Sequence, residues 1–228
     1  MLGHMVTKYL EQYHEIETIN HRWISEEFKT TIIDSDADFL INCVGAIPQR
    51  TKDFDINWEL PIWLDKHFNG KIVHPSTDCE MDNDDYGVSK LKATAFIMDY
   101  GERTKMIKSS IIGPELNGNT SMLYWFLSNE DGSQINGYSN HMWNGITTFS
   151  WAKFCKKMLD SWDEYPKRTV LGSECVSKYT MCKIFNKVYG RNITVNSFET
   201  ERSVNKCLDY DVKLDHIEIQ LTEMLKFM

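Results

Sequence analysis

A tyrosine and a lysine four positions apart, Tyr86 and Lys90 in the stretch DDYGVSKLKA, have side chains and spacing suited to proton transfer. On a helix, residues i and i+4 lie one turn apart on the same face, so the phenol and the ammonium would meet. A nearby ammonium favours the phenolate and lowers the pKa of a tyrosine, which can then exchange a proton near neutral pH. The pair therefore predicts acid–base chemistry on a carbonyl or alcohol oxygen.

The spacing alone does not identify this pair as catalytic. Ten tyrosines and 19 lysines among 228 residues make about one such pair expected by chance, and a second copy occurs at Tyr179 and Lys183. The second copy stands inside a predicted helix, and we expect a half-buried tyrosine and a solvated lysine there. Tyr86 and Lys90 instead follow an apolar strand that ends in the sequence STD. Ligands of open α/β sheets bind outside the carboxyl ends of the strands, so this copy predicts a site.

The elements that must position this site alternate between helix and strand up to about residue 113. Apolar residues at helical spacing predict a helix over 2–14, and alternating residues predict a strand over 15–20. A nearly continuous apolar run predicts a buried strand over 38–47. The same reasoning predicts helices over 56–68 (with a proline near its middle), 86–100, 147–162 and 176–190, and strands over 70–78 and 104–115. This order predicts an α/β fold with a shortened Rossmann-like parallel sheet and helices on both faces.

The composition limits the classes of function. Hydrophobic residues make up 42% of the chain and charged residues 25%, as in ordinary globular proteins. The net charge of −8, without a dense Lys/Arg run, argues against a nucleic-acid partner, because such proteins neutralise phosphates. No apolar run is long enough to span a bilayer, so we expect no membrane partner. The six cysteines form no Cys-x-x-Cys pair and have no histidine at metal-ligand spacing, which predicts no metal site and reduced, structural cysteines in a cytoplasmic protein.

Several stretches together resemble the extended short-chain dehydrogenase/reductase superfamily, most closely its dTDP-4-dehydrorhamnose reductases. The resemblance rests on the strand, the STD turn and YGVSK in that order. It extends over nearly the whole chain through LGHMVTKYL, DFLINCVGAIPQ, INWELPIWL, IKSSIIGPEL and WFLSNEDGSQINGYSNHMWNGITT. It implies a Rossmann-like cofactor domain over 1–112 and 146–165, and a small substrate-binding region over 113–145 and 166–228.

The resemblance implies a role for each matching residue. Tyr86 would be the proton donor, Lys90 its activator and ribose partner, and Thr77 the partner of the substrate oxygen. The other residues expected around the cofactor are Gly3 from the phosphate turn, His21 and Arg22 near the adenosine ribose, Gly45 and Ala46 along the adenosine, Asn57 behind the site, and Ser109, Ser110 and Ile111 beside the nicotinamide. The residues expected on the substrate side are Ser76, Trp125, His141, Trp143 and Asn144.

Two of these assignments have an open alternative. A cation such as Arg22 after the second strand favours the 2′-phosphate of NADP, whereas an acidic residue there would favour NAD. A plain surface position is an equally good interpretation of Arg22, so NAD stays open as the cofactor. For the tryptophans, packing in the core or at an interface is the stronger interpretation.

Three features depart from the family. The opening residues, Met1 to Gly3, match only the tail of the glycine-rich turn, so the first strand of the family's sheet has no counterpart. Residues 21–38 join two strands where the family has a further strand and a longer helix. Only nine positions separate Thr77 from Tyr86, and we expect this short acidic loop to be unfavourable beside an anionic nucleotide sugar. Its acidic residues are Asp78, Glu80, Asp82, Asp84 and Asp85.

These observations predict an NADP(H)-dependent reductase of a nucleotide-linked 4-keto-6-deoxy sugar, with a homodimer as an open expectation. Two alternatives remain. One is a non-catalytic binding module of the same fold, as in the regulatory subunit of methionine adenosyltransferase, which resembles this subfamily and acts by binding a partner. The other is a sugar-nucleotide epimerase or dehydratase, which would use the same tyrosine and lysine and retain its cofactor tightly.

Overall fold

The computed structural model describes residues 1–118 and 120–228. None of the helices formed by these residues is long and apolar enough to cross a bilayer. The elements follow the order α1 (Leu2–Leu10), α2 (Glu26–Ile33), β1 (Phe39–Ile41), α3 (Ile56–His67), β2 (Lys71–Ser76), η1 (Asp78–Met81), α4 (Asp85–Tyr100), β3 (Thr104–Lys108), β4 (Ile111–Ile112), α5 (Met122–Leu127), β5 (Gln134–Tyr138), β6 (His141–Trp143), β7 (Ile146–Thr147), α6 (Thr148–Asp160), η2 (Trp162–Glu164), β8 (Arg168–Gly172), β9 (Val176–Ser177), α7 (Lys178–Val188), β10 (Thr194–Phe198), β11 (Val204–Lys206), β12 (Val212–Lys213) and α8 (Ile217–Phe227).

The chain divides into two compact units, which are described separately. The sheet unit comprises Thr7–Lys108 and Phe154–Thr169. The C-terminal unit comprises Met1–Val6, Ser109–Lys153 and Val170–Met228. Helix α4 carries the YGVSK motif, and η1 lies in the loop before it. Both elements belong to the sheet unit.

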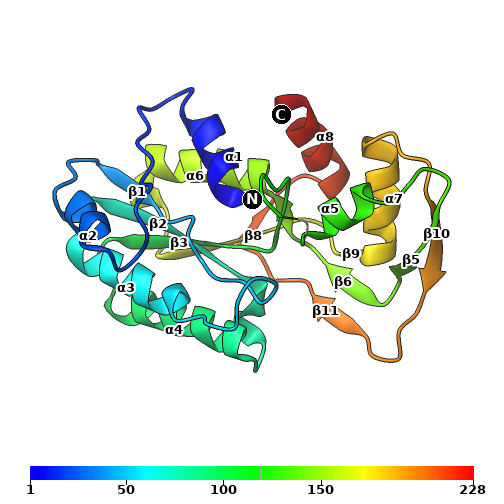
Figure 1. Cartoon of the computed structure of the whole chain (residues 1–228), viewed down its shortest axis with the longest axis horizontal. Coiled ribbons are helices and arrows are strands. Elements are labelled where there is room, and N and C mark those ends of the chain that lie inside the picture. Colours follow the sequence, from blue (N-terminus) through cyan, green and yellow to red (C-terminus); the bar gives the residue numbers. More distant parts are fainter. Residues whose placement is uncertain (119) are drawn as a thin grey trace. The chain divides into compact units, whose positions relative to one another are not determined.

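A five-stranded sheet runs in the order β1-β2-β3-β8-β12. In the sheet unit, β1 pairs with β2 and β2 with β3, both in parallel. The helices α3 and α4 cover one face of these strands, and residues 154–160 of α6 lie on the opposite face (Figure 1). The predicted parallel sheet with helices on both faces is therefore confirmed.

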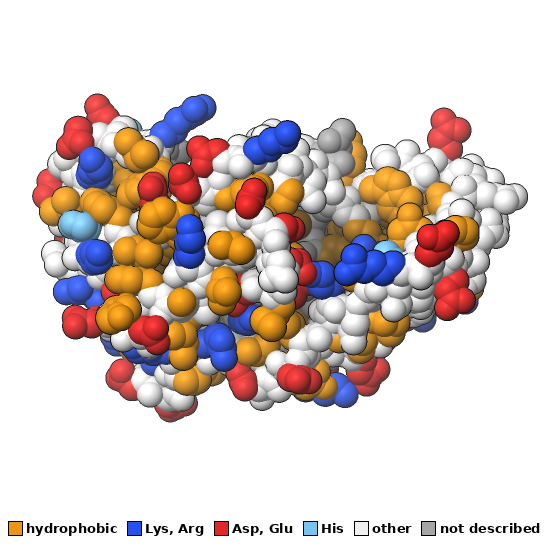
Figure 2. All heavy atoms as spheres, turned by 90° about the horizontal axis from the view of Figure 1, so that it is seen from below, with side chains coloured by type: hydrophobic (Ala, Val, Ile, Leu, Met, Phe, Trp, Pro, Cys, Tyr) orange, Lys and Arg blue, Asp and Glu red, His pale blue; other side chains and the backbone are white. Residues whose placement is uncertain are grey.

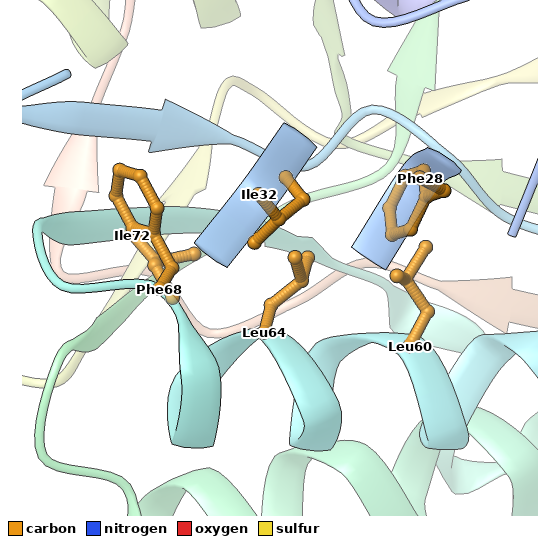
Figure 3. Close-up of a cluster of buried hydrophobic side chains, with 6 residues drawn as sticks. All are labelled: Phe28, Ile32, Leu60, Leu64, Phe68 and Ile72. Carbon is orange, nitrogen blue, oxygen red and sulfur yellow. The ribbon is translucent and has the colours of Figure 1, made fainter. Parts of the chain in front are cut away.

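A cluster of buried apolar side chains holds α3 against the sheet. It is formed by Phe28 and Ile32 from α2, Leu60 and Leu64 from α3, Phe68 after that helix and Ile72 from β2 (Figure 3). Complete burial of one such side chain stabilises the fold by about 1.5–3 kcal/mol relative to exposure. The cluster fixes the position of α3, and α3 carries Asn57 toward the predicted site.

The helices begin and end where the sequence provides caps. The Oγ of Ser25 accepts a hydrogen bond from the backbone N–H of Phe28 at the start of α2 (3.1 Å), as an N-cap serine does. Gly190, predicted to end the helix 176–190, follows α7 with a φ of +61°, a conformation that glycine adopts without steric cost.

Two predicted elements near the N-terminus differ from the structure. The strand expected over 15–20 is wrong, because this segment is irregular and exposed except for a half-buried Ile16. A strand needs a partner for its backbone hydrogen bonds, and alternation in the sequence does not reveal whether the fold supplies one. The helix expected over 2–14 ends at Leu10, and the strand expected over 38–47 is limited to β1.

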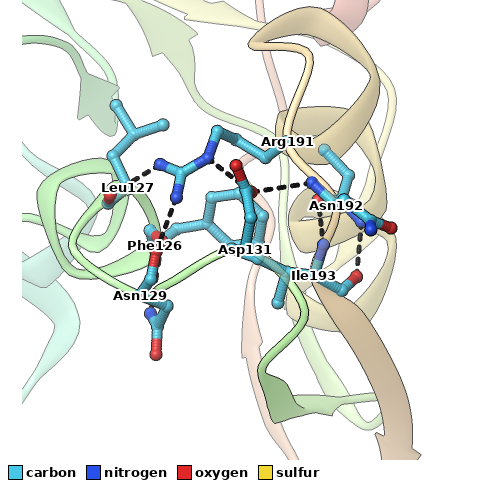
Figure 4. Close-up of polar contacts among 8 residues, drawn as sticks. Phe126, Leu127, Asn129, Asp131, Arg191, Asn192 and Ile193 are labelled. Atoms are coloured by element: carbon cyan, nitrogen blue, oxygen red, sulfur yellow. Dashed lines mark hydrogen bonds and ion pairs between the residues drawn. The ribbon is translucent and has the colours of Figure 1, made fainter.

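The C-terminal unit contains three small sheets around α7. Strand β5 pairs with β10 in parallel, β6 pairs with β11 in parallel and with β9 in antiparallel, and β4 pairs with β7 in parallel. The Arg191 guanidinium joins two loops of this unit (Figure 4). It donates to the Asp131 carboxylate (2.9 Å) and to the carbonyl oxygens of Leu127 (2.7 Å) and Asn129 (2.6 Å). These bonds fix the loop before β5 against the loop after α7.

A disulfide joins Cys175 and Cys207 in the C-terminal unit, with their Cα atoms 5.9 Å apart. The prediction that all six cysteines are reduced is therefore wrong. The two positions are 32 residues apart, and no short-range motif in the sequence marks them as partners. The cytoplasmic prediction rested in part on reduced cysteines, and the disulfide removes that support.

Candidate active site

Tyr86 and Lys90 lie in the first turns of α4, which begins shortly after the carboxyl end of β2. The Asp84 carboxylate caps the helix by accepting a hydrogen bond from the backbone N–H of Gly87 (2.7 Å). The Tyr86 ring packs edge-to-face against Phe54, with the ring centroids 5.7 Å apart. The phenol is thus held by a capped helix on one side and by an aromatic ring on the other.

Thr77, the first residue after β2, lies beside Tyr86. Its hydroxyl donates to the Asp78 carboxylate (3.1 Å) and accepts from the backbone N–H of Cys79 (3.2 Å), and it is near enough to the Tyr86 phenol to affect the pKa of that phenol. The structure thus brings together the two oxygen atoms that the sequence assigned to one substrate oxygen. Their catalytic roles stay a prediction.

The pKa of Tyr86 is raised to about 12. Burial is the largest cause, the neighbouring Cys79, Asp78 and Asp84 side chains add to it, and the Thr77 hydroxyl acts in the opposite direction. The expectation of a lowered pKa is therefore corrected, because burial and neighbouring negative charge dominate. In this state Tyr86 holds its proton at neutral pH, which suits a proton donor.

The backbone at Gly45 passes close to the side chains of Lys90 and Asn57. Lys90 Nζ and Asn57 Oδ1 would each lie 3.1 Å from a Cβ at that position, so a larger residue would crowd both side chains. The Asn57 amide fixes the loop, since Oδ1 accepts from the N–H of Ala46 (2.8 Å) and Nδ2 donates to its carbonyl (3.1 Å). Burial lowers the pKa of Lys90 to about 8, and the Glu80 charge acts in the opposite direction.

These residues fit a nicotinamide cofactor. Gly45 leaves the space that a Cβ would fill beside the Lys90 ammonium, and that ammonium has donors suited to ribose hydroxyls. In the C-terminal unit, the Ser109 hydroxyl is buried and has no hydrogen-bond partner among the described residues. Residues 1–118 and 120–228 contain no cluster of three or more His, Cys, Asp or Glu side chains that could hold a metal.

The other residues predicted near the cofactor differ in their surroundings. Gly3 is half-buried in the first turn of α1, and His21 and Arg22 are exposed on the loop before α2. The carbonyl of Ser110 accepts from the N–H of Ile146 (2.9 Å), and Ile111 opens β4.

The predicted substrate-side residues other than Ser76 lie in the C-terminal unit. Trp125 is 44% exposed on α5, whereas His141 and Trp143 are half-buried in β6. Asn144 is buried, and its amide pairs with the backbone of Leu208 through bonds of 2.8 and 2.9 Å. This contact occupies the Asn144 amide and indicates a structural role.

The acidic loop before α4 is partly buried, because Asp84 and Asp85 are exposed whereas two other carboxylates are enclosed. Asp78 and Glu80 are buried, with 8% and 4% of their surface exposed. Glu80 in particular is a residue whose role the sequence did not reveal. Its partners are Ser76, Thr94 and Lys108, which are polar residues at buried positions of neighbouring elements. Polar residues at these otherwise apolar positions were the signal in the sequence that could have indicated a buried partner.

The second tyrosine–lysine pair behaves as an ordinary surface pair. The Lys183 ammonium lies 5.4 Å from the centroid of the Tyr179 ring, and Lys183 is exposed to solvent. Tyr179 is half-buried in the first turn of α7. The prediction made for this copy is confirmed.

Comparison with known proteins shows that the fold is similar to solved structures, whereas the sequence identity to them is low. No protein-family model and no curated protein matches the chain. Among solved structures, the dTDP-4-dehydrorhamnose reductase of Clostridium acetobutylicum superposes with a TM-score of 0.70 at 16% identity, over 99% of this chain and 95% of that one. The Bacillus anthracis dTDP-4-dehydrorhamnose reductase, solved in complex with NADP, gives 0.70 at 11% identity over 98% and 95%. The UDP-N-acetylglucosamine 4-epimerase of Bacillus cereus gives 0.67 at 17% identity over 100% and 93%.

The chain has the fold of the extended short-chain dehydrogenase/reductases. The resemblance inferred from the sequence is confirmed at the level of the fold, with dTDP-4-dehydrorhamnose reductases among the similar structures. Identities of 11–17% leave the reaction and the substrate to be argued from the site itself.

Proposed function

We propose that this chain is an NADP(H)-dependent reductase of a nucleotide-linked 4-keto-6-deoxy sugar. The observation that supports the proposal most directly is that the Thr77 hydroxyl lies near the Tyr86 phenol, at the start of the helix that also carries Lys90. The fold supports it as well, because similar structures include reductases of this type, and one of them contains NADP.

Three residues have distinct roles in the proposed reduction. A reduced nicotinamide, when bound, supplies the hydride. Thr77 and Tyr86 hold the carbonyl oxygen of the substrate between their hydroxyls, and Tyr86 gives its proton to that oxygen as negative charge develops there. The Lys90 ammonium binds the ribose and stabilises the phenolate that remains.

The raised pKa of Tyr86 is compatible with the role of proton donor in a reduction. Burial and the charges of Asp78 and Asp84 favour the protonated phenol. An epimerase has the same fold in Bacillus cereus, so we retain epimerisation as the second candidate function.

The test is the reduction of dTDP-4-keto-6-deoxy sugars by NADPH, followed by the loss of nicotinamide absorbance. Tyr86→Phe should lower kcat by about 10²–10⁴-fold, because it removes the proton donor. Tyr179→Phe is the matched control, since it removes the same hydroxyl from the second tyrosine–lysine pair, and it should leave kcat unchanged. Full activity of Tyr86→Phe would refute the mechanism.

We also propose a homodimer that forms through α4. Val88, Leu91 and Met98 lie on one side of this helix and are 39–46% exposed. Hydrophobic side chains recur across the face formed by α3 and α4 in the space-filling view (Figure 2). Light scattering should give twice the chain mass for the native protein and the single mass for Leu91→Glu, whereas Ile219→Glu on α8 should stay dimeric.

A further inference from the structure

The buried Glu80 carboxylate links three elements around the candidate site. One oxygen accepts hydrogen bonds from the hydroxyls of Ser76, at the end of β2, and Thr94, in the middle of α4 (2.5 Å to Thr94). The other oxygen is 2.8 Å from Nζ of Lys108, at the end of β3. Glu80 itself is 4% exposed. Three donors are thus directed at the two oxygens of this carboxylate.

The partners of Glu80 are adjacent to the residues proposed to react. Ser76 directly precedes Thr77, so the bond to Ser76 fixes the strand end from which Thr77 extends. Thr94 lies one turn beyond Lys90 and two turns beyond Tyr86 on the same side of α4. The carboxylate therefore lies where β2 meets the side of α4 that carries the reactive residues.

The Glu80 charge favours the ammonium form of Lys90, although the ion pair of Glu80 is with Lys108. Asn57 contributes an uncharged amide from α3. His74 on β2 is fully buried, and its pKa is lowered to about 3, so the ring is neutral. Of the two groups from η1 that favour the Lys90 ammonium, Glu80 has a larger effect than Cys79. The other charged or titratable groups near the site include Asp78, Asp84, Tyr86 and Lys108, and Lys108 is paired with Glu80.

We propose that Glu80 is a positioning residue of the site, which locks the end of β2 onto α4 through Ser76 and Thr94 and places its negative charge one helical turn from Lys90. It contacts neither substrate nor cofactor and acts through Ser76, Thr94 and Lys90. The catalytic part of this role rests on the proposed reductase function. The effect of the Glu80 charge on Lys90 is a property of the folded chain and does not depend on the proposed reaction.

The experiment measures the protonation of Lys90 without requiring turnover. The full chain is pulsed with acetic anhydride between pH 6 and 10, and acetylation of the Lys90 peptide is quantified by mass spectrometry. The wild-type midpoint is expected near pH 8, the pKa that burial gives Lys90. Glu80→Gln should move the midpoint down by about one pH unit, because loss of an opposite charge destabilises the ammonium.

Two further variants keep the test decisive. Glu80→Gln leaves the buried Lys108 ammonium unpaired, so Glu80→Gln combined with Lys108→Met is made as well, and circular dichroism shows which of them fold. A lower midpoint is expected in each folded Glu80 variant. Asp85→Asn removes an exposed charge from the first turn of α4 and should leave the midpoint unchanged. An unchanged midpoint in the folded Glu80 variants, or an equal fall in Asp85→Asn, would overturn the proposal.

Activity measurements separate this proposal from the proposed function. In the Glu80 variants the alkaline limb of kcat/KM should move down with the Lys90 midpoint, and Glu80→Asp should restore part of the shift. A purely structural role would lower activity equally at every pH, and that result would contradict the inference. If the wild-type chain reduces no keto-sugar, the proposed function fails, and the acetylation midpoints alone decide the role of Glu80.

Discussion

His74 shows how a single buried side chain couples stability to pH in this protein. It is fully buried on β2, with its Nδ1 3.2 Å from the amide nitrogen of Asn42. Burial first, and the charge of Lys90 second, lower its pKa to about 3. The folded chain therefore keeps a neutral ring at acidities where the unfolded chain would take up a proton.

The resulting prediction concerns unfolding between pH 6.5 and 5. Because the folded pKa of His74 is depressed, its contribution is fully present above about pH 6.5 and is lost as the pH falls, by about 1.4 kcal/mol per pH unit. Urea unfolding of the wild type should show this loss, and His74→Gln should show a shallower dependence. Equal slopes in the two proteins would contradict the burial argument.

At the scale of elements, α4 was the most predictable part of the site. Its sequence range, 86–100, was predicted to within one residue, and the structure adds the Asp84 cap at its start. The segment 15–20 failed for a different reason. Its alternation was genuine, but strand formation depends on a partner strand that local sequence does not specify.

The cap of α4 gives a test at this scale. The Asp84 carboxylate satisfies the N–H of Gly87 at the start of the helix that carries Tyr86 and Lys90. Asp84→Ala should lower the free energy of unfolding by about 1 kcal/mol, whereas Asp84→Asn, which can still cap, should retain most of it. Chemical denaturation measures both, and equal losses would indicate that charge rather than capping stabilises this end.

The environment of the site was less predictable than the elements that form it. The motif was enough to assign Thr77, Tyr86 and Lys90, and the structure brings Thr77 into contact with Tyr86. The raised pKa of Tyr86 and the burial of Glu80 depend on how β2, η1 and α4 pack. The sequence of an acidic loop does not show whether its carboxylates are buried, because burial depends on hydrogen-bond donors that lie far away along the chain.

At the scale of the whole molecule, the disulfide is the feature that the sequence concealed. It closes a segment of 32 positions in the C-terminal unit, between the loop after β8 and the segment after β11. In the chain-entropy description, a closure of that length stabilises the fold by about 3–4 kcal/mol. A reductant should lower the free energy of unfolding of the wild type by this amount.

Cys175→Ser is the control for that measurement. The variant lacks the disulfide, so its stability should equal that of the reduced wild type and should not respond to reductant. If the wild type unfolds identically with and without reductant, and mass spectrometry finds six free thiols, the disulfide is absent from the protein in solution.

The central claim is that the site around Lys90 holds a nicotinamide cofactor, and the most direct test is a titration of this chain with NADPH and with NADH, followed by nicotinamide fluorescence. We predict saturable binding, tighter for NADPH, that Lys90→Met weakens by at least tenfold while Lys183→Met leaves it unchanged. No binding to a well-folded sample would contradict the reductase account and would favour the non-catalytic binding module.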